Sequence, residues 1–127
     1  MHQNITTVAL FDQQSDEATK FIIGETGLTT IACEVEQIDK IYHLLQDSTN
    51  KCSKVCNLKN LIVFGDESKL TAKNNKNWKN GDLNLFFYDD VVNMGSKVNR
   101  EDRKFYVPKG DDVFMLSYTS GTTGNPK

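Results

Sequence analysis

The sequence predicts an α/β fold in which parallel strands are connected through helices, as in βαβ units. Short runs of β-branched and apolar residues alternate along the chain with stretches whose apolar residues recur at helical spacing. In addition, the last apolar run leads directly into a loop rich in Gly, Ser and Thr, and open α/β sheets place ligands at such strand ends. Alternation of this kind typically produces parallel strands joined by crossovers. We therefore expect a sheet covered by helices on both faces.

The first predicted pair is a strand followed by an amphipathic helix. Thr6–Phe11 favours a strand. The helix is expected over Asp16–Glu25, because Ser15 is a good N-cap and Gly27 lies where a left-handed C-cap would end it. Its buried stripe is predicted from three residues at helical spacing, namely Ala18, Phe21 and Ile22.

The second predicted pair repeats this order. Thr29–Cys33 is β-branched and strand-like, and Glu36–Gln46 reads as a helix. The apolar stripe of this helix consists of Ile38, Ile41, Tyr42 and Leu45. His43 falls on its polar edge, so we expect a surface residue there rather than a base. A polar connector is predicted over Asp47–Asn57.

The second half of the chain supplies further short elements. Strands are predicted over Leu61–Phe64 and Leu83–Tyr88. Between them, Lys69–Asn80 is rich in Asn and Lys, which favours a solvated loop or a frayed helix over a nucleic-acid patch, since acidic residues flank it. A short helix is expected over Asp89–Val98, and Asn99–Gly110 reads as a charged connector.

The carboxyl end carries the most specific pattern. Asp112–Tyr118 contains an apolar run of strand length, and a loop rich in hydroxyl groups and glycine follows it as far as Lys127. Glycines lack Cβ, so their N–H groups can approach an anion closely, while hydroxyls can donate to phosphate oxygens or face a metal ion through a lone pair. A lysine adds positive charge. The pattern favours a polyphosphate-binding loop at a strand tip.

Two other kinds of loop have a similar composition. Clusters of Gly, Ser and Thr usually form plain polar turns or tails. The P-loop of common NTPases is excluded, because it needs four residues between its glycines and then Lys-Ser or Lys-Thr. Here two residues separate Gly121 from Gly124, and Lys127 follows three positions later.

Composition narrows the class of protein. The formal net charge of −2 does not indicate nucleic-acid binding, which needs an excess of positive charge. No apolar run approaches the length of a membrane span. The residues after Met1 lack the basic and apolar regions of a secretory signal, so a cytosolic-facing protein is expected. Three cysteines and two histidines do not give the spacing of a zinc site, and idle or buried thiols are favoured at Cys33, Cys52 and Cys56.

The string Tyr118–Lys127 resembles the phosphate-binding signature of the adenylate-forming superfamily, which includes acyl-CoA synthetases, luciferases and the adenylation domains of peptide synthetases. Upstream, Thr7–Asp12, Asp16–Ile23, Leu28–Ile31 and Leu58–Phe64 resemble long-chain fatty acyl-CoA synthetases. The segment Gln13-Gln14-Ser15 departs from the Thr-Leu-Gly-like turn of that family, which puts the shape of the local loop in question.

The resemblance implies that residues 1–127 are part of an AMP-binding (adenylation) N-terminal domain, truncated at both ends. It implies ATP-dependent activation of a fatty acid to acyl-adenylate, followed by thioester formation with coenzyme A. It also implies ATP and Mg²⁺ as ligands, a cytoplasmic-side location, and peripheral association with a membrane such as the endoplasmic reticulum. The nucleotide-binding residues carried over are Tyr118, Thr119, Ser120, Gly121, Thr122, Thr123, Gly124 and Lys127.

By the same resemblance, Thr122 faces the metal ion, and no catalytic residue lies within this chain. Two alternatives stay open: an adenylate-forming ligase for a short acid or an amino acid, and a non-catalytic α/β interaction module. The 127-residue polypeptide alone is expected to be inactive, because an ionised α-carboxylate at Lys127 would lie beside the anion-binding loop.

Overall fold

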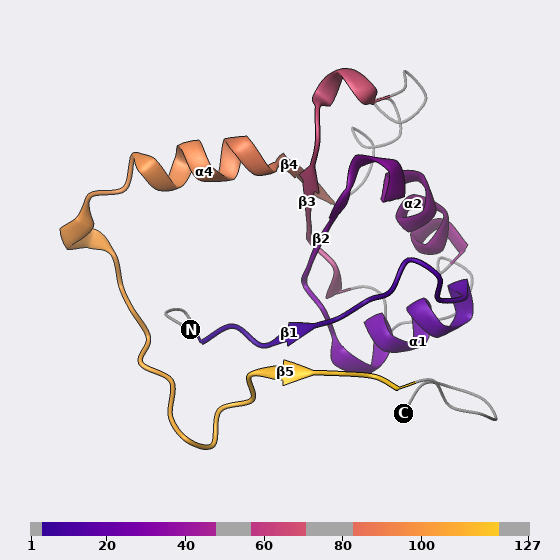
Figure 1. The fold of residues 1–127 in the computed structure, drawn as a ribbon, viewed down its shortest axis with the longest axis horizontal. Helices are drawn as coiled ribbons and strands as arrows, with labels where there is room; N and C mark the ends of the chain where they lie inside the picture. The colour runs from indigo at the N-terminus through magenta and orange to yellow at the C-terminus, as the bar shows by residue number, and fades with distance from the viewer. Residues whose placement is uncertain (1–3, 48–56, 71–82, 120–127) are drawn as a thin grey trace.

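The computed structural model describes residues 4–47, 57–70 and 83–119 (Figure 1). In these residues the strands form two parallel sheets. The larger sheet has the order β2-β3-β4, with β2 over Thr30–Glu34, β3 over Asn60–Phe64 and β4 over Asn84–Phe87. The smaller sheet pairs β1 (Thr7–Val8) with β5 (Met115–Leu116). The predicted α/β fold with parallel strands is confirmed, but its strands divide between two sheets.

Helix α1 spans Asp16–Thr26 and has both predicted caps. Ser15 Oγ accepts a hydrogen bond from the backbone N–H of Ala18 at 3.2 Å. At the other end, Gly27 has φ of 62° and its N–H donates to the Ile23 carbonyl at 3.1 Å. Both caps were predictable because each depends on one residue type at one place in the local sequence.

The buried stripe of α1 differs from the prediction. Thr19, Ile22 and Ile23 are buried, whereas Ala18 and Phe21 are only half-buried. The stripe is therefore displaced by about one residue. A threonine can occupy the buried position because its Oγ1 donates to the Ser15 carbonyl at 3.0 Å, which satisfies the hydroxyl within the helix.

The remaining helices lie close to their predicted positions. A 3₁₀ turn, η1 (Val35–Gln37), leads into α2 (Ile38–Asp47). Helix α4 spans Tyr88–Ser96. Two 3₁₀ turns, η4 (Glu67–Lys69) and η5 (Arg100–Asp102), lie within the segments predicted as loops or at their edges. Residues 48–56 and 71–82, which hold most of both polar connectors, lie outside the described residues. No helix in the described ranges is long and apolar enough to cross a membrane.

The hydrophobic core lies on one face of the larger sheet. Ile31, Leu61 and Val63 point to that face and pack with buried residues of α1 and η1–α2, among them Ile23 and Ile38. On the other face, Ala32, Ile62 and Phe86 are in register, and none of the three is buried. Helix α4 runs away from the sheet rather than over that face (Figure 1). The expected cover of helices on both faces is therefore wrong for the described part of the chain.

Polar side chains connect the strands on this uncovered face. Asn60 Nδ2 donates to Thr30 Oγ1 at 3.3 Å, and Asn84 Nδ2 donates to Asn60 Oδ1 at 3.1 Å. At the opposite end of the sheet, the rings of Phe64 and Tyr88 lie with centroids 4.9 Å apart. These contacts connect the strands, although both rings stay exposed, Phe64 at 37% and Tyr88 at 47%.

The core is confined to the first half of the chain. Every buried residue in the described ranges falls between Thr19 and Val63, and no side chain in residues 83–119 is buried. The later segment therefore forms an arm that extends from the sheet along α4 and returns to pair β5 with β1 (Figure 1).

Candidate phosphate-binding site

The candidate site begins where β5 delivers the loop. Thr7 N–H donates to the Phe114 carbonyl at 3.1 Å, and Thr6 Oγ1 donates to the Val113 carbonyl at 2.8 Å. Thr7 pairs with Met115 in a parallel register, so β1 and β5 end at the same edge. The predicted strand over Asp112–Tyr118 is thus present but reduced to two residues. Residues 117–119 follow directly from the end of this parallel strand.

Only the first two of the predicted binding residues are described. Tyr118 is half-buried and Thr119 is exposed, so the tyrosine packs partly against the protein. The remaining candidates lie outside the described residues, and their roles stay predictions: Ser120, Gly121, Thr122, Thr123, Gly124 and Lys127.

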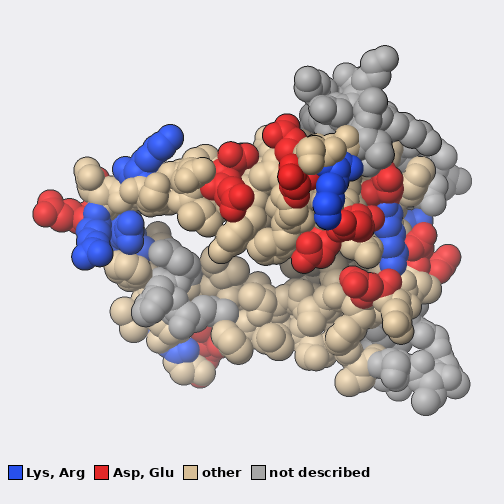
Figure 2. Space-filling view, turned by 45° about the horizontal axis from the view of Figure 1, so that its top comes forward, with Lys and Arg blue, Asp and Glu red and all other residues tan. Residues whose placement is uncertain are grey.

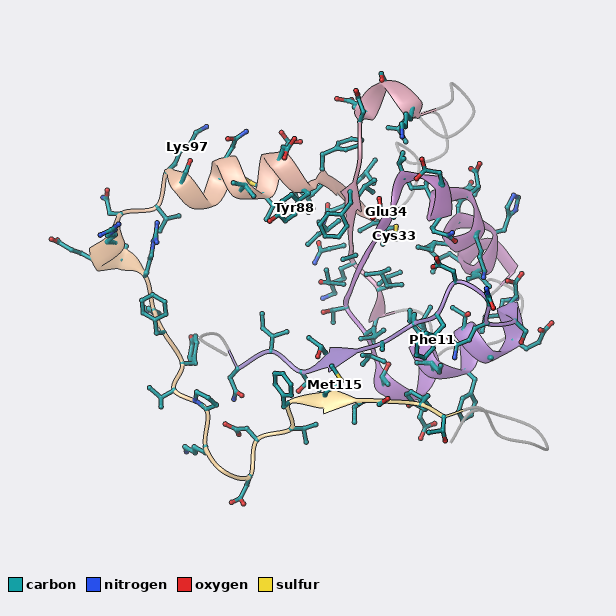
Figure 3. All side chains as sticks on the ribbon, in the orientation of Figure 1. Phe11, Cys33, Glu34, Tyr88, Lys97 and Met115 are labelled. Atoms are coloured by element: carbon teal, nitrogen blue, oxygen red, sulfur yellow. The ribbon has the colours of Figure 1, made fainter. Side chains whose placement is uncertain are left out.

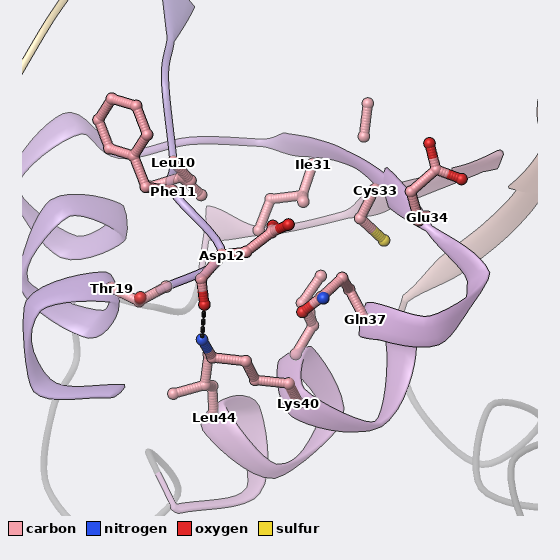
Figure 4. A pocket seen from close by; sticks show the side chains of 12 residues that line it. Leu10, Phe11, Asp12, Thr19, Ile31, Cys33, Glu34, Gln37, Lys40 and Leu44 are labelled. Atoms are coloured by element: carbon pink, nitrogen blue, oxygen red, sulfur yellow. Dashed lines mark hydrogen bonds between the residues drawn. The ribbon is translucent and has the colours of Figure 1, made fainter. Parts of the chain in front are cut away.

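A turn follows β1 at the same edge of the small sheet. Gln14 N–H donates to the Phe11 carbonyl at 3.0 Å, and Gln14 Oε1 accepts from Phe11 N–H at 3.2 Å. Lys40 Nζ of α2 donates to the Asp12 carbonyl at 3.0 Å (Figure 4). It also donates to the Gln14 carbonyl at 3.2 Å. The sequence departs from the acyl-CoA synthetase pattern here, yet the turn is closed by its own glutamine and by Lys40. This role of Lys40 could not be predicted from the sequence, because its acceptors are backbone carbonyls, which every residue has.

A hollow of about 110 Å³ lies between this turn, β2 and α2 (Figure 4). Its walls include apolar Leu10, Ile31 and Leu44 and polar Asp12, Cys33, Gln37 and Lys40. Pockets for drug-sized ligands and cofactors measure roughly 300–1,000 Å³, so this space is too small for a nucleotide. It is not the candidate active site.

The thiol of Cys33 lines the same hollow. Burial, and secondarily the charge of neighbouring Glu34, raises the pKa of this thiol to about 11. The thiol is therefore protonated near neutral pH, whereas nucleophilic and metal-binding cysteines are thiolates. In the described ranges, no three His, Cys, Asp or Glu side chains gather as a metal site. Cys33 is a half-buried free cysteine, and Cys52 and Cys56 lie outside the described residues.

The perturbed carboxylates belong to surface turns. The pKa of Glu36 is lowered, first by its own backbone N–H and then by Lys69, whose Nζ lies 3.3 Å from Glu36 Oε1. The pKa of Asp66 is lowered mainly by the N–H of Ser68, which donates to Asp66 Oδ1 at 2.8 Å. Exposed pairs and turns of this kind contribute little to stability and indicate no catalytic role. His43 is exposed, as predicted.

Comparison with known proteins extends these observations. The family model described as "AMP-binding enzyme" matches residues 1–127. The chain is 30% identical over 129 residues to long chain acyl-CoA synthetase 2 of Arabidopsis thaliana, covering 100% of this chain and 17% of that protein. It is 24% identical over 127 residues to fatty acyl-CoA synthetase A of Dictyostelium discoideum, again covering 100% of this chain and 17% of the relative. The chain thus spans about a sixth of the length of the curated relatives it matches.

Solved structures share the fold. The adenylation domain of a carboxylate reductase from Mycobacterium chelonae superposes with a TM-score of 0.73 and 19% identity, over 96% of this chain and 19% of that one. The A-PCP didomain of a carboxylic acid reductase from Segniliparus rugosus, solved with AMP, gives a TM-score of 0.69 and 22% identity, over 97% and 17%. The family match over the whole chain and these adenylation-domain folds agree with the loop motif. The chain belongs to the AMP-binding enzyme family.

Proposed function

We propose that this chain is part of an ATP-dependent ligase that activates a long-chain fatty acid as acyl-adenylate and then transfers the acyl group to coenzyme A. One observation carries the proposal. In a member of the AMP-binding family, the hydroxyl- and glycine-rich string Tyr118–Lys127 follows a parallel strand, β5, closely in the sequence. The acyl-CoA synthetases among its relatives support the fatty-acid class of substrate.

The loop would act on the leaving group. In the first step the fatty acid carboxylate attacks the α-phosphorus of ATP, and the bond between that phosphorus and the α,β-bridging oxygen breaks, so that pyrophosphate leaves with this oxygen. In the second step the coenzyme A thiolate displaces AMP. Donors held in place before the reaction stabilise negative charge as it moves onto the pyrophosphate. Hydroxyl and glycine N–H groups suit this task, and Lys127 adds a positive charge.

The donor set also fits a magnesium ion. Hydroxyl and phosphate oxygens are hard ligands of the kind that Mg²⁺ takes in nucleotide sites. We assign Thr122 Oγ1 as the protein ligand in this loop. When bound, Mg²⁺ supplies charge neutralisation on the phosphates.

We further propose that residues 1–127 are part of a larger AMP-binding domain. On β5 and the residues before it, both alternating faces are apolar and exposed: Val113 (54%) and Met115 (50%) on one, Phe114 (63%) and Leu116 (37%) on the other. A strand that is apolar on both faces is typical of the interior of a parallel sheet with two covered faces. The small share of the relatives' length that the chain spans supports this reading.

The experiment is palmitate-dependent pyrophosphate release with ATP and Mg²⁺, measured on the longest polypeptide that the reading frame of this chain encodes. Thr122→Ala is expected to lower the rate by about 10²–10³-fold, the scale for losing one preorganised stabilising group. Thr29→Ala, at an exposed threonine outside the loop, should leave it unchanged. If neither palmitate nor any other fatty acid supports pyrophosphate release, the proposal is contradicted.

A panel of acids separates the alternatives. The solved structures with a similar fold are adenylation domains of carboxylic acid reductases. A carboxylic acid other than a long-chain fatty acid is therefore the second candidate substrate. Release with a short acid or an amino acid, but not with palmitate, would establish another adenylate-forming ligase. Release with none of the acids, from a folded protein, would favour a non-catalytic module.

A further inference from the structure

A lysine of α2 attaches the chain beyond β1 to the core of the protein. Lys40 Nζ donates to the Asp12 carbonyl and to the Gln14 carbonyl, which are 28 and 26 positions away in the sequence. The hydrogen bonds between Gln14 and Phe11 lie within the turn itself. They fix the shape of the turn, whereas the two bonds from Lys40 join the turn to α2.

Helix α2 is a firm support for this lysine. Its residues Ile38, Ile41 and Leu44 are buried, and the two isoleucines belong to the core cluster. Lys40 is half-buried and lines the small hollow between the turn, β2 and α2. A lysine on a helix surface usually keeps its ammonium group in water, but here two backbone carbonyls take two of its three N–H donors. Lys40 therefore ties the position of the turn to that of the core.

The turn continues from the strand that holds β5. Val8 pairs with Leu116 in a parallel register, so both segments leave the small sheet at the same edge. Figure 3 shows Phe11 beyond the end of β1 and Met115 on the adjoining strand. The string Tyr118–Lys127 begins two residues after Leu116. Contacts thus run from α2 through the turn and β1 to the strand that precedes this string.

The charges around Lys40 argue against a direct contact with an anionic ligand. Figure 2 shows Lys and Arg interspersed with Asp and Glu over the α1–α2 side of the molecule, on the face in view. Asp12 and Glu34 line the same hollow as Lys40, and carboxylates repel an anion. The two backbone carbonyls, in contrast, are neutral acceptors that the ammonium group already contacts. Lys40 is therefore better suited to holding the backbone than to binding phosphate.

On the basis of the function proposed above, we propose that Lys40 is a positioning residue for the ligation reaction. It holds the turn of residues 11–14 on α2, and through β1 it fixes β5, from which the phosphate-binding string continues. The small sheet needs such support because β1 and β5 are each two residues long. Donors that stabilise charge on pyrophosphate must be fixed before the reaction, and a displacement of about 1 Å can cost about a hundredfold in rate.

Hydrogen exchange tests the attachment without any reaction. The longest polypeptide that the reading frame encodes is compared with its Lys40→Met variant, which keeps an aliphatic side chain but loses the N–H donors. Amide exchange at Gln14 in the turn and at Thr7, whose N–H donates to β5, should accelerate by about tenfold, the scale for losing a hydrogen bond to a charged group. The amides of β3 should be unchanged. Unaltered exchange at Gln14 or Thr7 would overturn the proposal.

Steady-state kinetics with ATP and palmitate test the positioning itself. Lys40→Met should lower kcat by about tenfold to a hundredfold and leave the KM for ATP nearly unchanged, because the lost fixation matters most in the transition state. Lys40→Arg keeps a cation that can donate to both carbonyls, so it should recover most of the rate. Lys69→Met is the matched control, because Lys69 Nζ donates to the exposed Glu36 carboxylate at 3.3 Å. It should change neither the exchange nor the rate.

The outcomes separate this inference from the proposed function. If the unsubstituted protein releases no pyrophosphate with any acid, the proposed function fails and the role in ligation fails with it, while hydrogen exchange still decides whether Lys40 holds the edge. In an active protein, equal rates for Lys40→Met and Lys69→Met overturn the inference alone. A raised KM for ATP with kcat unchanged, or a loss that Lys40→Arg does not reduce, overturns it too. Rates are compared at a temperature where circular dichroism shows every variant to be folded.

Discussion

Replacing Leu61 with alanine tests where the stability of this fold resides. Leu61 is fully buried on the central strand β3, in register between Ile31 of β2 and Leu85 of β4, and it belongs to the core that α1 and α2 cover. The change removes three carbons, which corresponds to about 2.4 kcal/mol of transfer free energy at roughly 0.8 kcal/mol per carbon. A cavity adds about 24 cal/mol for each Å³ that does not collapse.

The expected loss in the free energy of unfolding is therefore about 3–4 kcal/mol, measured by urea denaturation with the slope of the transition unchanged. Ile62→Ala is the matched control, because it deletes as many carbons from the next residue of the same strand, on the opposite face where Ile62 is only half-buried. Its cost should be about half as large or less. A loss under about 1 kcal/mol for Leu61→Ala, or equal losses for both variants, would refute the assignment of the core to this face.

Two further predictions concern local features. Gly27→Ala should destabilise the protein by about 1 kcal/mol, because Gly27 ends α1 with φ of 62°. Gly95→Ala, within α4 and facing open space, should instead stabilise it by about 0.5–1 kcal/mol. Thermal unfolding of both variants measures the difference, and a similar loss of stability at the two sites would contradict the backbone argument. With Cys52 and Cys56 replaced by serine, the rate of Cys33 alkylation should keep rising with pH up to about pH 11, because the thiolate is disfavoured in the folded state. For the same reason the free energy of unfolding should fall between about pH 9 and 11. An alkylation rate that levels off near pH 9 would show an accessible thiol with an ordinary pKa.

Elements whose causes are local could be predicted from the sequence. Ser15 and Gly27 fixed the ends of α1 because capping depends on one side chain and one backbone conformation. Helix α4 was placed within two residues of its observed ends for a similar reason, since its apolar residues recur at helical spacing. The phosphate-binding interpretation rests on the same kind of evidence, a contiguous string of residues that ends at Lys127.

Features that join distant segments could not be predicted. Thr6 meets Val113 across 107 positions, and nothing in either segment specifies the other. The division into two sheets follows from that pairing, because β1 takes β5 as its partner while β2 and β3 pair separately. Lys40 was missed because its acceptors are backbone carbonyls, which every residue has. Thr19 was missed because its burial depends on an internal hydrogen bond rather than on apolarity.

The position of β5 bears on the proposed activity. The strand that precedes the proposed phosphate-binding loop is two residues long, and its described anchors are the ladder with β1 and the hydroxyl contacts of Thr6 and Thr7. Hydrogen bonds of this kind each contribute about 1 kcal/mol net, and those at exposed positions compete with water. Stabilising a transition state requires donors that are fixed before the reaction, and a displacement of about 1 Å can cost a hundredfold in rate.

Apolar side chains on both faces of β5 therefore have a functional consequence. If neighbouring layers of a larger domain cover Val113 to Leu116, burial at about 25 cal/mol per Å² would fix the strand far more firmly than its present hydrogen bonds do. The loop would then be positioned by packing that the 127 residues do not themselves provide. On this argument we expect the 127-residue polypeptide to lack activity, because β5 is held too weakly to fix the loop. ATP in excess would then give no pyrophosphate release from the 127-residue polypeptide, and release at saturating ATP would refute this argument.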